Sequence, residues 1–161
     1  RAQLPISPED TAGSLHDRLA SLTEQRLPPW LRALEGGELR PEEQPAVGVS
    51  YAHKLTKAEG QLDLQQPAAL LARKIQAFDP WPVASVGVGE ERLRLFGASV
   101  AECAPDEEAG QLLELDARGV LIATGAGAIR IRELQWPGRK RLPAAQALQG
   151  RDISVGSRIE I

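Results

Sequence analysis

The sequence predicts a mainly β fold: a small barrel with one or two helices, preceded by a helical segment. Short apolar runs separated by glycine-containing turns recur through the second half of the chain, as is typical of antiparallel strands. Within these runs apolar and charged residues alternate, which indicates strands with one buried face. The first 34 residues instead carry leucines at helical spacing. Five or six strands at this spacing favour a closed barrel, with a two-sheet sandwich as the other option.

The composition is that of a globular protein. The 161 residues are 42% hydrophobic and 25% charged, which allows one modest core and a smaller flanking element. No apolar run approaches the roughly 20 residues of a membrane-spanning helix, so we expect no membrane association. The single cysteine, Cys103, cannot form a disulfide within the chain, which suits a reducing compartment. We therefore predict a cytoplasmic protein.

The N-terminal segment is predicted to be helical. Asp10 or Thr11 can cap a helix, because their side chains accept hydrogen bonds from the first turn. Leucines at positions 15, 19 and 22 then recur on one face. A second, short helix is expected over residues 28–34, ending at a glycine pair. This apolar surface is too small to stand alone, so we expect the helices to pack on a body outside this sequence.

A second domain is predicted to follow a linker. Residues 35–45 are rich in Pro, Glu and Arg and have no hydrophobic period, as is typical of linkers. A short extended piece opens the domain, and a helix is expected over residues 67–78. Leu71, Ile75 and Phe78 share one face of that helix, which predicts that this face is buried.

The rest of the chain is predicted to form strands. In the second strand two leucines alternate with Arg92 and Arg94, and in the fifth two isoleucines alternate with Arg130 and Arg132. Because successive strand residues point to opposite sides, both strands are expected to present arginines outward. The predicted strands are residues 83–88, 92–99, 111–116, 120–124, 128–134 and 157–161.

The sequence indicates no catalytic or metal site. Ser14, His16 and Asp17 are the residue types of a hydrolase triad, but on a helix Ser14 and His16 point about 200° apart and cannot meet. Two His and one Cys spread along the chain fail every zinc-ligand spacing. Gly125 and Gly127 lie between two predicted strands, so they indicate a hairpin turn and not a phosphate-binding loop, which would precede a helix.

The charge is unevenly distributed. The whole chain has a formal net charge of −3, yet residues 128–151 contain six basic side chains and one acidic side chain. A local positive surface of this kind attracts polyanions. A basic face that is merely solvated is the alternative interpretation.

Four stretches of this sequence resemble the C-terminal part of the methionyl-tRNA formyltransferases. They occur in the family's order, at compatible spacing, and together extend over nearly the whole chain. Each stretch is weak evidence alone, and the four together are strong. The stretches are residues 10–19, 51–63, 73–82 and 123–140.

The resemblance implies a two-part enzyme. In this family a Rossmann-like α/β domain binds 10-formyltetrahydrofolate and uses an Asn, a His and an Asp to formylate initiator methionyl-tRNA. An OB-like barrel helps to hold the tRNA. Residues 1–34 then correspond to the C-terminal helices of the catalytic domain, 35–45 to the linker and 46–161 to the tRNA-binding barrel. The catalytic set is expected upstream of residue 1, and the sequence contains no asparagine, so this chain alone is predicted to be inactive.

The resemblance also implies that basic residues of this chain face the tRNA. It matches two of them to lysines at the entrance of the family's barrel and two to its basic turn. Helix and strand geometry add three outward arginines. Contacts to phosphates give affinity that is largely independent of sequence and falls steeply with salt. The predicted RNA-binding residues are Lys54, Lys57, Arg73, Arg130, Arg132, Arg139 and Lys140.

Two functions remain open from the sequence. In the first, the parent enzyme is a monomer that uses 10-formyltetrahydrofolate as co-substrate, and this segment, which binds no cofactor or metal itself, positions initiator methionyl-tRNA. In the second, the segment is the barrel of another formyltransferase-type enzyme, such as one acting on a nucleotide sugar, and has a structural or assembly role without RNA binding. A free-standing single-strand binder is disfavoured, because two Phe and one Tyr supply few stacking platforms.

Overall fold

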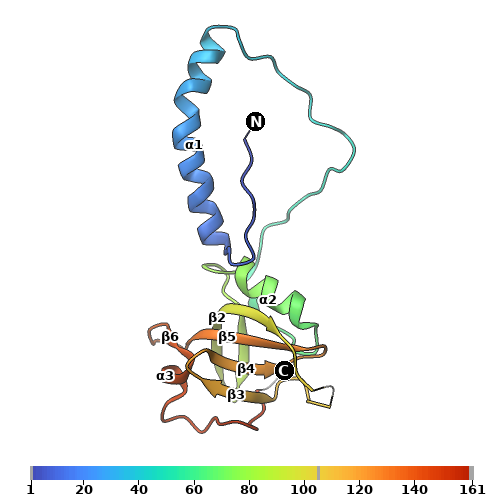
Figure 1. The fold of residues 1–161 in the computed structure, drawn as a ribbon, viewed down its shortest axis with the longest axis vertical. Helices are drawn as coiled ribbons and strands as arrows, with labels where there is room; N and C mark the ends of the chain where they lie inside the picture. The colour runs from blue at the N-terminus through green and yellow to red at the C-terminus, as the bar shows by residue number, and fades with distance from the viewer. Residues whose placement is uncertain (1, 105, 160–161) are drawn as a thin grey trace. The chain divides into compact units, whose positions relative to one another are not determined.

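The chain folds into two compact units. The computed structural model describes residues 2–104 and 106–159. One unit is Arg1–Leu55 and contains a long helix, and the other is Thr56–Ile161 and contains the sheet (Figure 1). The domain boundaries expected from the sequence, at residues 34 and 45, stay a prediction.

A single helix, α1 (Ala12–Glu35), dominates the first unit (Figure 1). Thr11 caps it, as one of the two predicted caps: the Ser14 N–H donates to Thr11 Oγ1 (3.1 Å), and the Thr11 N–H donates to Ser14 Oγ (2.9 Å). The expected division into two helices is wrong, because α1 runs through Pro28 and Pro29. Proline removes a backbone donor and its ring crowds the carbonyl four residues earlier, which costs helix stability, but its fixed φ near −65° is itself helical and is compatible with the continuous α1.

No residue of α1 is buried among the described residues. Its leucines stay partly open to solvent, as Leu19 and Leu31 show with about half of their surface exposed (47% and 50%). The apolar stripe predicted from the sequence is therefore present but uncovered. That it packs on a body outside this sequence stays a prediction.

The second unit is a mainly β domain, as predicted. Six strands form one antiparallel sheet in the order β1-β2-β5-β4-β3, and β6 pairs with β5. Among the described residues, no ladder joins β1 to β3, so closure into an OB-like barrel stays a prediction. The elements are η1 (Lys57–Gly60), α2 (Ala68–Ala77), β1 (Ser85–Val88), β2 (Glu91–Ala101), β3 (Leu112–Asp116), β4 (Gly119–Ala123), β5 (Ala128–Gln135), β6 (Leu142–Pro143) and α3 (Ala144–Leu148).

Most predicted elements of this unit are confirmed within a few residues. The helix expected over residues 67–78 is α2, and the first five predicted strands are β1 to β5. The sixth prediction, residues 157–161, extends beyond the described part at residues 160–161. Its described residues, 157–159, form no strand, and Arg158 makes one isolated bridge to Gln111. The structure adds β6 and α3, which are two and five residues long and too short for a periodic signal.

Along β2 and β5, the buried side chains lie on one face of the sheet at one end and on the opposite face at the other end. Leu95 pairs with Leu134, and Ala98 pairs with Ile131; all four are buried. Leu95 and Ala98 are an odd number of residues apart, so the two pairs project from opposite faces. Gly97 lies between them with a φ of +64°, a conformation that favours glycine. The sheet therefore coils strongly enough for both faces to contribute to one core.

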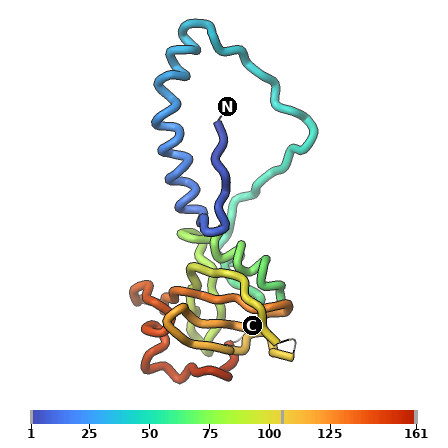
Figure 2. Tube along the Cα trace, in the orientation of Figure 1, coloured from blue at the N-terminus to red at the C-terminus, as the bar shows by residue number. Residues whose placement is uncertain are grey.

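Helix α2 packs against β2 and β5. These two strands are paired and lie side by side in Figures 1 and 2. The predicted buried face is confirmed, since Leu71, Ile75 and Phe78 are at most 9% exposed. Burying a large apolar side chain contributes about 1.5–3 kcal/mol. The largest fully buried side chains are Leu64, Leu71, Ile75, Leu93, Leu95, Leu112, Ile122, Ile129, Ile131, Leu134, Val86 and Val120.

The two neighbouring leucines of α2 provide a test of this packing. Leu71→Ala is expected to lower the free energy of unfolding by about 2–5 kcal/mol, because it leaves a cavity in the core. Leu70→Ala is the matched control: the same atoms are removed one position along, where the side chain is 42% exposed, and a loss of about 1 kcal/mol or less is expected. Urea denaturation measures both. Equal losses would show that α2 does not pack as described.

Candidate nucleic-acid interface

A six-residue turn, residues 136–141, joins β5 to β6 and carries three basic side chains; we call it the basic turn. Its first residue is fixed in the core. Trp136 is 5% exposed, its Nε1–H donates to the Ala147 carbonyl (2.8 Å), and the Arg151 guanidinium lies 4.0 Å above its ring. Gly138, with a φ of +67°, allows the chain to reverse.

Hydrogen bonds hold the middle of the basic turn. The Arg139 N–H donates to the Trp136 carbonyl (3.1 Å), and the Gln135 side-chain amide donates to the Arg139 carbonyl (2.9 Å). The side chains of Arg139 and Lys140 are exposed. Neither forms an ion pair with any residue in 2–104 or 106–159. The backbone of the basic turn is thus fixed by hydrogen bonds, while the side chains of Arg139 and Lys140 stay exposed to solvent.

Arg130 lies in a network of opposite charges. The register places Glu114 of β3 and Arg130 of β5 on either side of Leu121 of β4, and the Arg130 guanidinium contacts Glu114 (2.5 Å) and Asp116 (3.4 Å). Arg118 contacts the same carboxylates at 3.3 and 2.7 Å. The Arg130 side chain is only 15% exposed. Its charge is therefore largely compensated within the sheet.

This network shifts the titration of one carboxyl group. The hydrogen bond from the Arg118 side chain lowers the pKa of Asp116 below its ordinary value of 3.8, and the charge of Arg130 adds to the effect. The same contact raises the pKa of Arg118. Both shifts favour the charged forms, so Asp116 and Arg118 stay ionised at neutral pH.

Arg132 lies on the same face of β5 as Arg130, as the alternation predicted. Its side chain crosses Gly97 of β2: a Cβ added to Gly97 would meet Arg132 Nε at 3.0 Å and its Cβ at 3.3 Å. The absence of a side chain at this glycine therefore makes room for the arginine. Arg132 is exposed at this position.

Lys57 and Arg73 lie on the helical elements. Lys57 is the first residue of η1, whose start is fixed by the Thr56 N–H donating to Glu59 Oε1 (2.7 Å). Arg73 lies on α2 on the side away from the core, as predicted. Both are exposed, and neither forms an ion pair within the described part of the chain.

The structure brings together some predicted residues and not others. Arg139 and Lys140 share the basic turn, and Arg130 and Arg132 share β5. Lys54 is exposed and belongs to the first unit, so no common site with the sheet is assigned to it. The third cation of the basic turn, Arg141, was not predicted, because three consecutive basic residues give no signal of which one pairs with acids elsewhere in the fold.

The other residues considered from the sequence form no catalytic triad or metal site within the described part of the chain. The Ser14 hydroxyl donates to Asp10 Oδ1 (3.0 Å), and His16 contacts Asp17 instead (3.3 Å), so there is no triad. The described residues contain no group of three or more His, Cys, Asp or Glu that could hold a metal ion.

Within the same residues, no helix is both long and apolar enough to cross a membrane. The turn at residues 125–127 joins β4 to β5, which confirms a hairpin.

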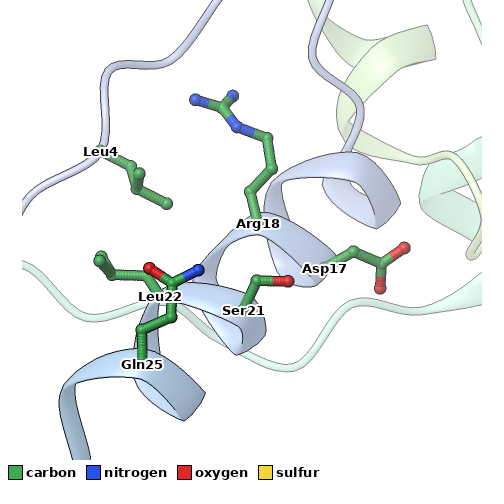
Figure 3. A pocket seen from close by; sticks show the side chains of 6 residues that line it. All are labelled: Leu4, Asp17, Arg18, Ser21, Leu22 and Gln25. Carbon is green, nitrogen blue, oxygen red and sulfur yellow. The ribbon is translucent and has the colours of Figure 1, made fainter.

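A hollow of about 320 Å³ lies in the first unit (Figure 3). Arg18 forms its wall and is held by an ion pair with Asp10 and by donating to the Pro5 carbonyl (3.0 Å). The hollow is open to solvent, and the Arg18 guanidinium on its wall is already paired with Asp10, so we assign no ligand to it. It is lined by Leu4, Asp17, Arg18, Ser21, Leu22 and Gln25.

Comparison with known families identifies the second unit. The model of the family "Formyl transferase, C-terminal domain" matches residues 54–152. The chain belongs to this family. The resemblance inferred from four stretches of the sequence is thereby confirmed, and so is the mainly β fold class. The match includes all seven predicted RNA-binding residues, and it does not address their roles.

Two similar curated proteins are both named methionyl-tRNA formyltransferase. The methionyl-tRNA formyltransferase of Xanthomonas axonopodis pv. citri (strain 306) is 48% identical over 151 residues, which are 92% of this chain and 49% of that protein. The methionyl-tRNA formyltransferase of Acidovorax ebreus (strain TPSY) is 43% identical over 94% of this chain and 48% of its own length. The chain spans about half the length of the curated relatives it matches.

Solved structures share the fold. A multiply substituted variant of HypX from Aquifex aeolicus is similar with a TM-score of 0.67 and 24% identity, over 91% of this chain and 27% of that one. HypX in complex with tetrahydrofolic acid gives a TM-score of 0.64 at 21% identity, over 98% and 30% of the two chains. At these identities the similarity concerns the fold of the formyl transferase C-terminal domain alone.

The charge network yields a prediction on pH dependence. Because the pKa of Asp116 is lowered in the folded state, its carboxylate contributes stability above the ordinary pKa of 3.8, and this contribution is lost as the pH falls through the lowered pKa. The stability difference between the protein and Asp116→Asn is therefore expected to be full at about pH 6 and to shrink below about pH 4. Denaturation at several pH values measures it.

NMR titration of the carboxyl carbon gives the same pKa directly. A midpoint below 3.8 is expected, and Arg118→Ala should move it back upward, since Arg118 is the main cause of the shift. A midpoint at or above 3.8 in the unsubstituted protein would contradict the described contacts.

Proposed function

We propose that the protein containing this chain transfers a formyl group from 10-formyltetrahydrofolate to the amino group of methionine on initiator tRNA, and that this segment positions the tRNA. Relatives named methionyl-tRNA formyltransferase, at 43–48% identity over at least 92% of the chain, support the activity. We further propose that the protein acts as a monomer in the cytoplasm and that this segment binds no cofactor of its own.

The basic turn is the observation that carries the positioning role. Its backbone is fixed by Trp136 and by two hydrogen bonds to Arg139, while the Arg139 and Lys140 side chains stay exposed. Phosphate contacts from such side chains set the register and orientation of a nucleic acid without reading its sequence. Discrimination of the initiator tRNA is therefore proposed to lie outside these residues.

The proposed contacts do not contribute equally. Arg130 has its charge compensated by Glu114 and Asp116, so it contributes least to phosphate binding. Among the described residues Lys57, Arg73, Arg139 and Lys140 form no ion pair, so no internal contact has to break before they meet a phosphate. Lys54 and Arg132 complete the proposed set.

The chemistry of formyl transfer is proposed to lie in another part of the protein. The amine nitrogen must bond to the formyl carbon, which develops an oxyanion on the formyl oxygen, and collapse of that oxyanion breaks the bond to the folate nitrogen. The resemblance implies an Asp that takes the proton from the attacking amine, and the leaving folate nitrogen gains a proton to give tetrahydrofolate. The resemblance implies an Asn and a His to stabilise that oxyanion, and each such donor contributes roughly 3–4 kcal/mol. This sequence has no asparagine, so the chain lacks one of the required groups.

Salt dependence of tRNA binding tests the positioning role. Lys57→Ala, Arg139→Ala and Lys140→Ala are each expected to weaken binding roughly threefold to tenfold and to reduce the slope of log K against log salt by about 0.7–0.9, because each removes one phosphate contact. Fluorescence anisotropy with labelled tRNA at several salt concentrations measures both quantities.

Arg118→Ala is the control for that series. It removes the same charge from a position held by Glu114 and Asp116, so the slope is expected to stay unchanged. If all three test variants bind like the unsubstituted chain, the positioning role is wrong, and the nucleotide-sugar alternative with a structural or assembly role is favoured.

An activity assay tests where the chemistry resides. This chain, incubated with 10-formyltetrahydrofolate and charged initiator tRNA, is expected to give no formylmethionyl-tRNA above the enzyme-free background. A purified relative such as the Xanthomonas enzyme serves as the positive control. Turnover by the chain itself would overturn the assignment of the chemistry to another part of the protein.

A further inference from the structure

Arg141, the last residue of the basic turn, is held by two carboxylates and an aromatic ring, while 39% of its side chain stays exposed. Its Nε donates to Glu133 Oε2 (2.8 Å), and Nη2 lies 2.6 Å from the same oxygen. Nη1 donates to Asp79 Oδ2 (3.0 Å). The flat face of the guanidinium lies 4.0 Å above the Phe96 ring.

These contacts connect three separate parts of the unit to the basic turn. Glu133 lies on β5, Phe96 lies opposite it on β2, and Asp79 follows the C-terminal end of α2. Arg141 therefore fixes the end of the turn against the helix and both central strands, as Trp136 fixes its beginning. Arg139 and Lys140 lie between these two anchors.

The engagement of Arg141 argues against direct contact with RNA. Each of its three guanidinium nitrogens meets a carboxylate, and one face is covered by an aromatic ring. The Asp79 side chain is only 15% exposed, so breaking this ion pair would leave a poorly hydrated carboxylate without its partner. A phosphate would have to compete with all of these contacts.

We propose that Arg141 is a positioning residue for RNA binding: it holds the basic turn so that Arg139 and Lys140 face the phosphates, and it does not contact the RNA itself. This inference rests on the proposed tRNA-positioning function. Planar, bidentate and stacking contacts together suit arginine and not lysine, so Arg141→Lys is expected to restore little of the effect of Arg141→Ala.

The sign of a charge effect separates positioning from simple electrostatics. The double variant Asp79→Asn with Glu133→Gln removes two negative charges beside the basic turn. Simple attraction of the RNA would then increase, and binding would tighten. The positioning role predicts the opposite: binding weakens by roughly threefold to tenfold, because Arg141 is released and the turn loses its second anchor.

A matched control removes two carboxylates elsewhere. The double variant Glu114→Gln with Asp116→Asn changes the net charge by the same amount on β3, two strands away from β5, and removes no contact of Arg141. It is expected to bind tRNA at least as tightly as the unsubstituted chain. Thermal melting of every variant is measured alongside, so that binding is compared only below each melting temperature.

A double-mutant cycle completes the experiment. Arg141→Ala is expected to weaken tRNA binding roughly threefold to tenfold in the unsubstituted chain and to have no further effect once Arg139 and Lys140 are both alanine. A further loss in that background would mean that Arg141 contacts RNA itself and would overturn the inference. Tighter binding by the Asp79→Asn, Glu133→Gln variant would also overturn it.

The proposed function fails in a different way. If the Arg139→Ala, Lys140→Ala variant binds tRNA as well as the unsubstituted chain, the basic turn does not contact RNA, and both the positioning role proposed for the basic turn and the inference about Arg141 are wrong. If that variant binds weakly while Arg141→Ala binds normally, only the positioning role of Arg141 is wrong.

Discussion

The second unit depends on one constraint, the change of core face between Leu95 and Ala98. A sheet that buried only one face along β2 would leave either Leu95 or Ala98 in water. Because the sheet coils, both contribute to a single core. The same coiling determines which residues of the second face become neighbours. It places the Phe96 ring, which is 4% exposed, beneath the Arg141 guanidinium of the basic turn.

Charge in this domain is divided between pairs that hold the fold and cations that face solvent. Arg130 and Arg141 are surrounded by carboxylates, whereas Arg139 and Lys140 form no ion pair with the described residues. An arginine that already holds two acids has little left to offer a phosphate, but it can fix the backbone of its neighbours. Net charge along the sequence cannot separate these two roles, since both appear as basic residues in the same short stretch.

The sequence predicted most strands and the buried face of α2, because alternation and helical spacing are local signals. It could not predict the exchange of core faces, which depends on the register between β2 and β5, nor the pairing of Arg130 with Glu114, which requires β3, β4 and β5 to be aligned. The break expected near Pro28 was wrong because proline's φ is compatible with a helix. Local patterns also cannot tell which cations contact RNA, and the family match identifies the domain without assigning a role to any of them.

The sheet ends on one side at β3, which has β4 as its only described strand neighbour. Residues 156–157 hydrogen-bond to Leu112 at the start of β3, and the remainder of the strand forms the edge. An edge of this kind exposes backbone groups that can pair with a strand of another molecule. Here Glu114 and Asp116 lie on that edge, and Arg118 follows in the adjoining turn. Charged side chains in these positions discourage a second copy from adding its own strand. The ion-pair network thereby helps to protect the domain from aggregation at this edge.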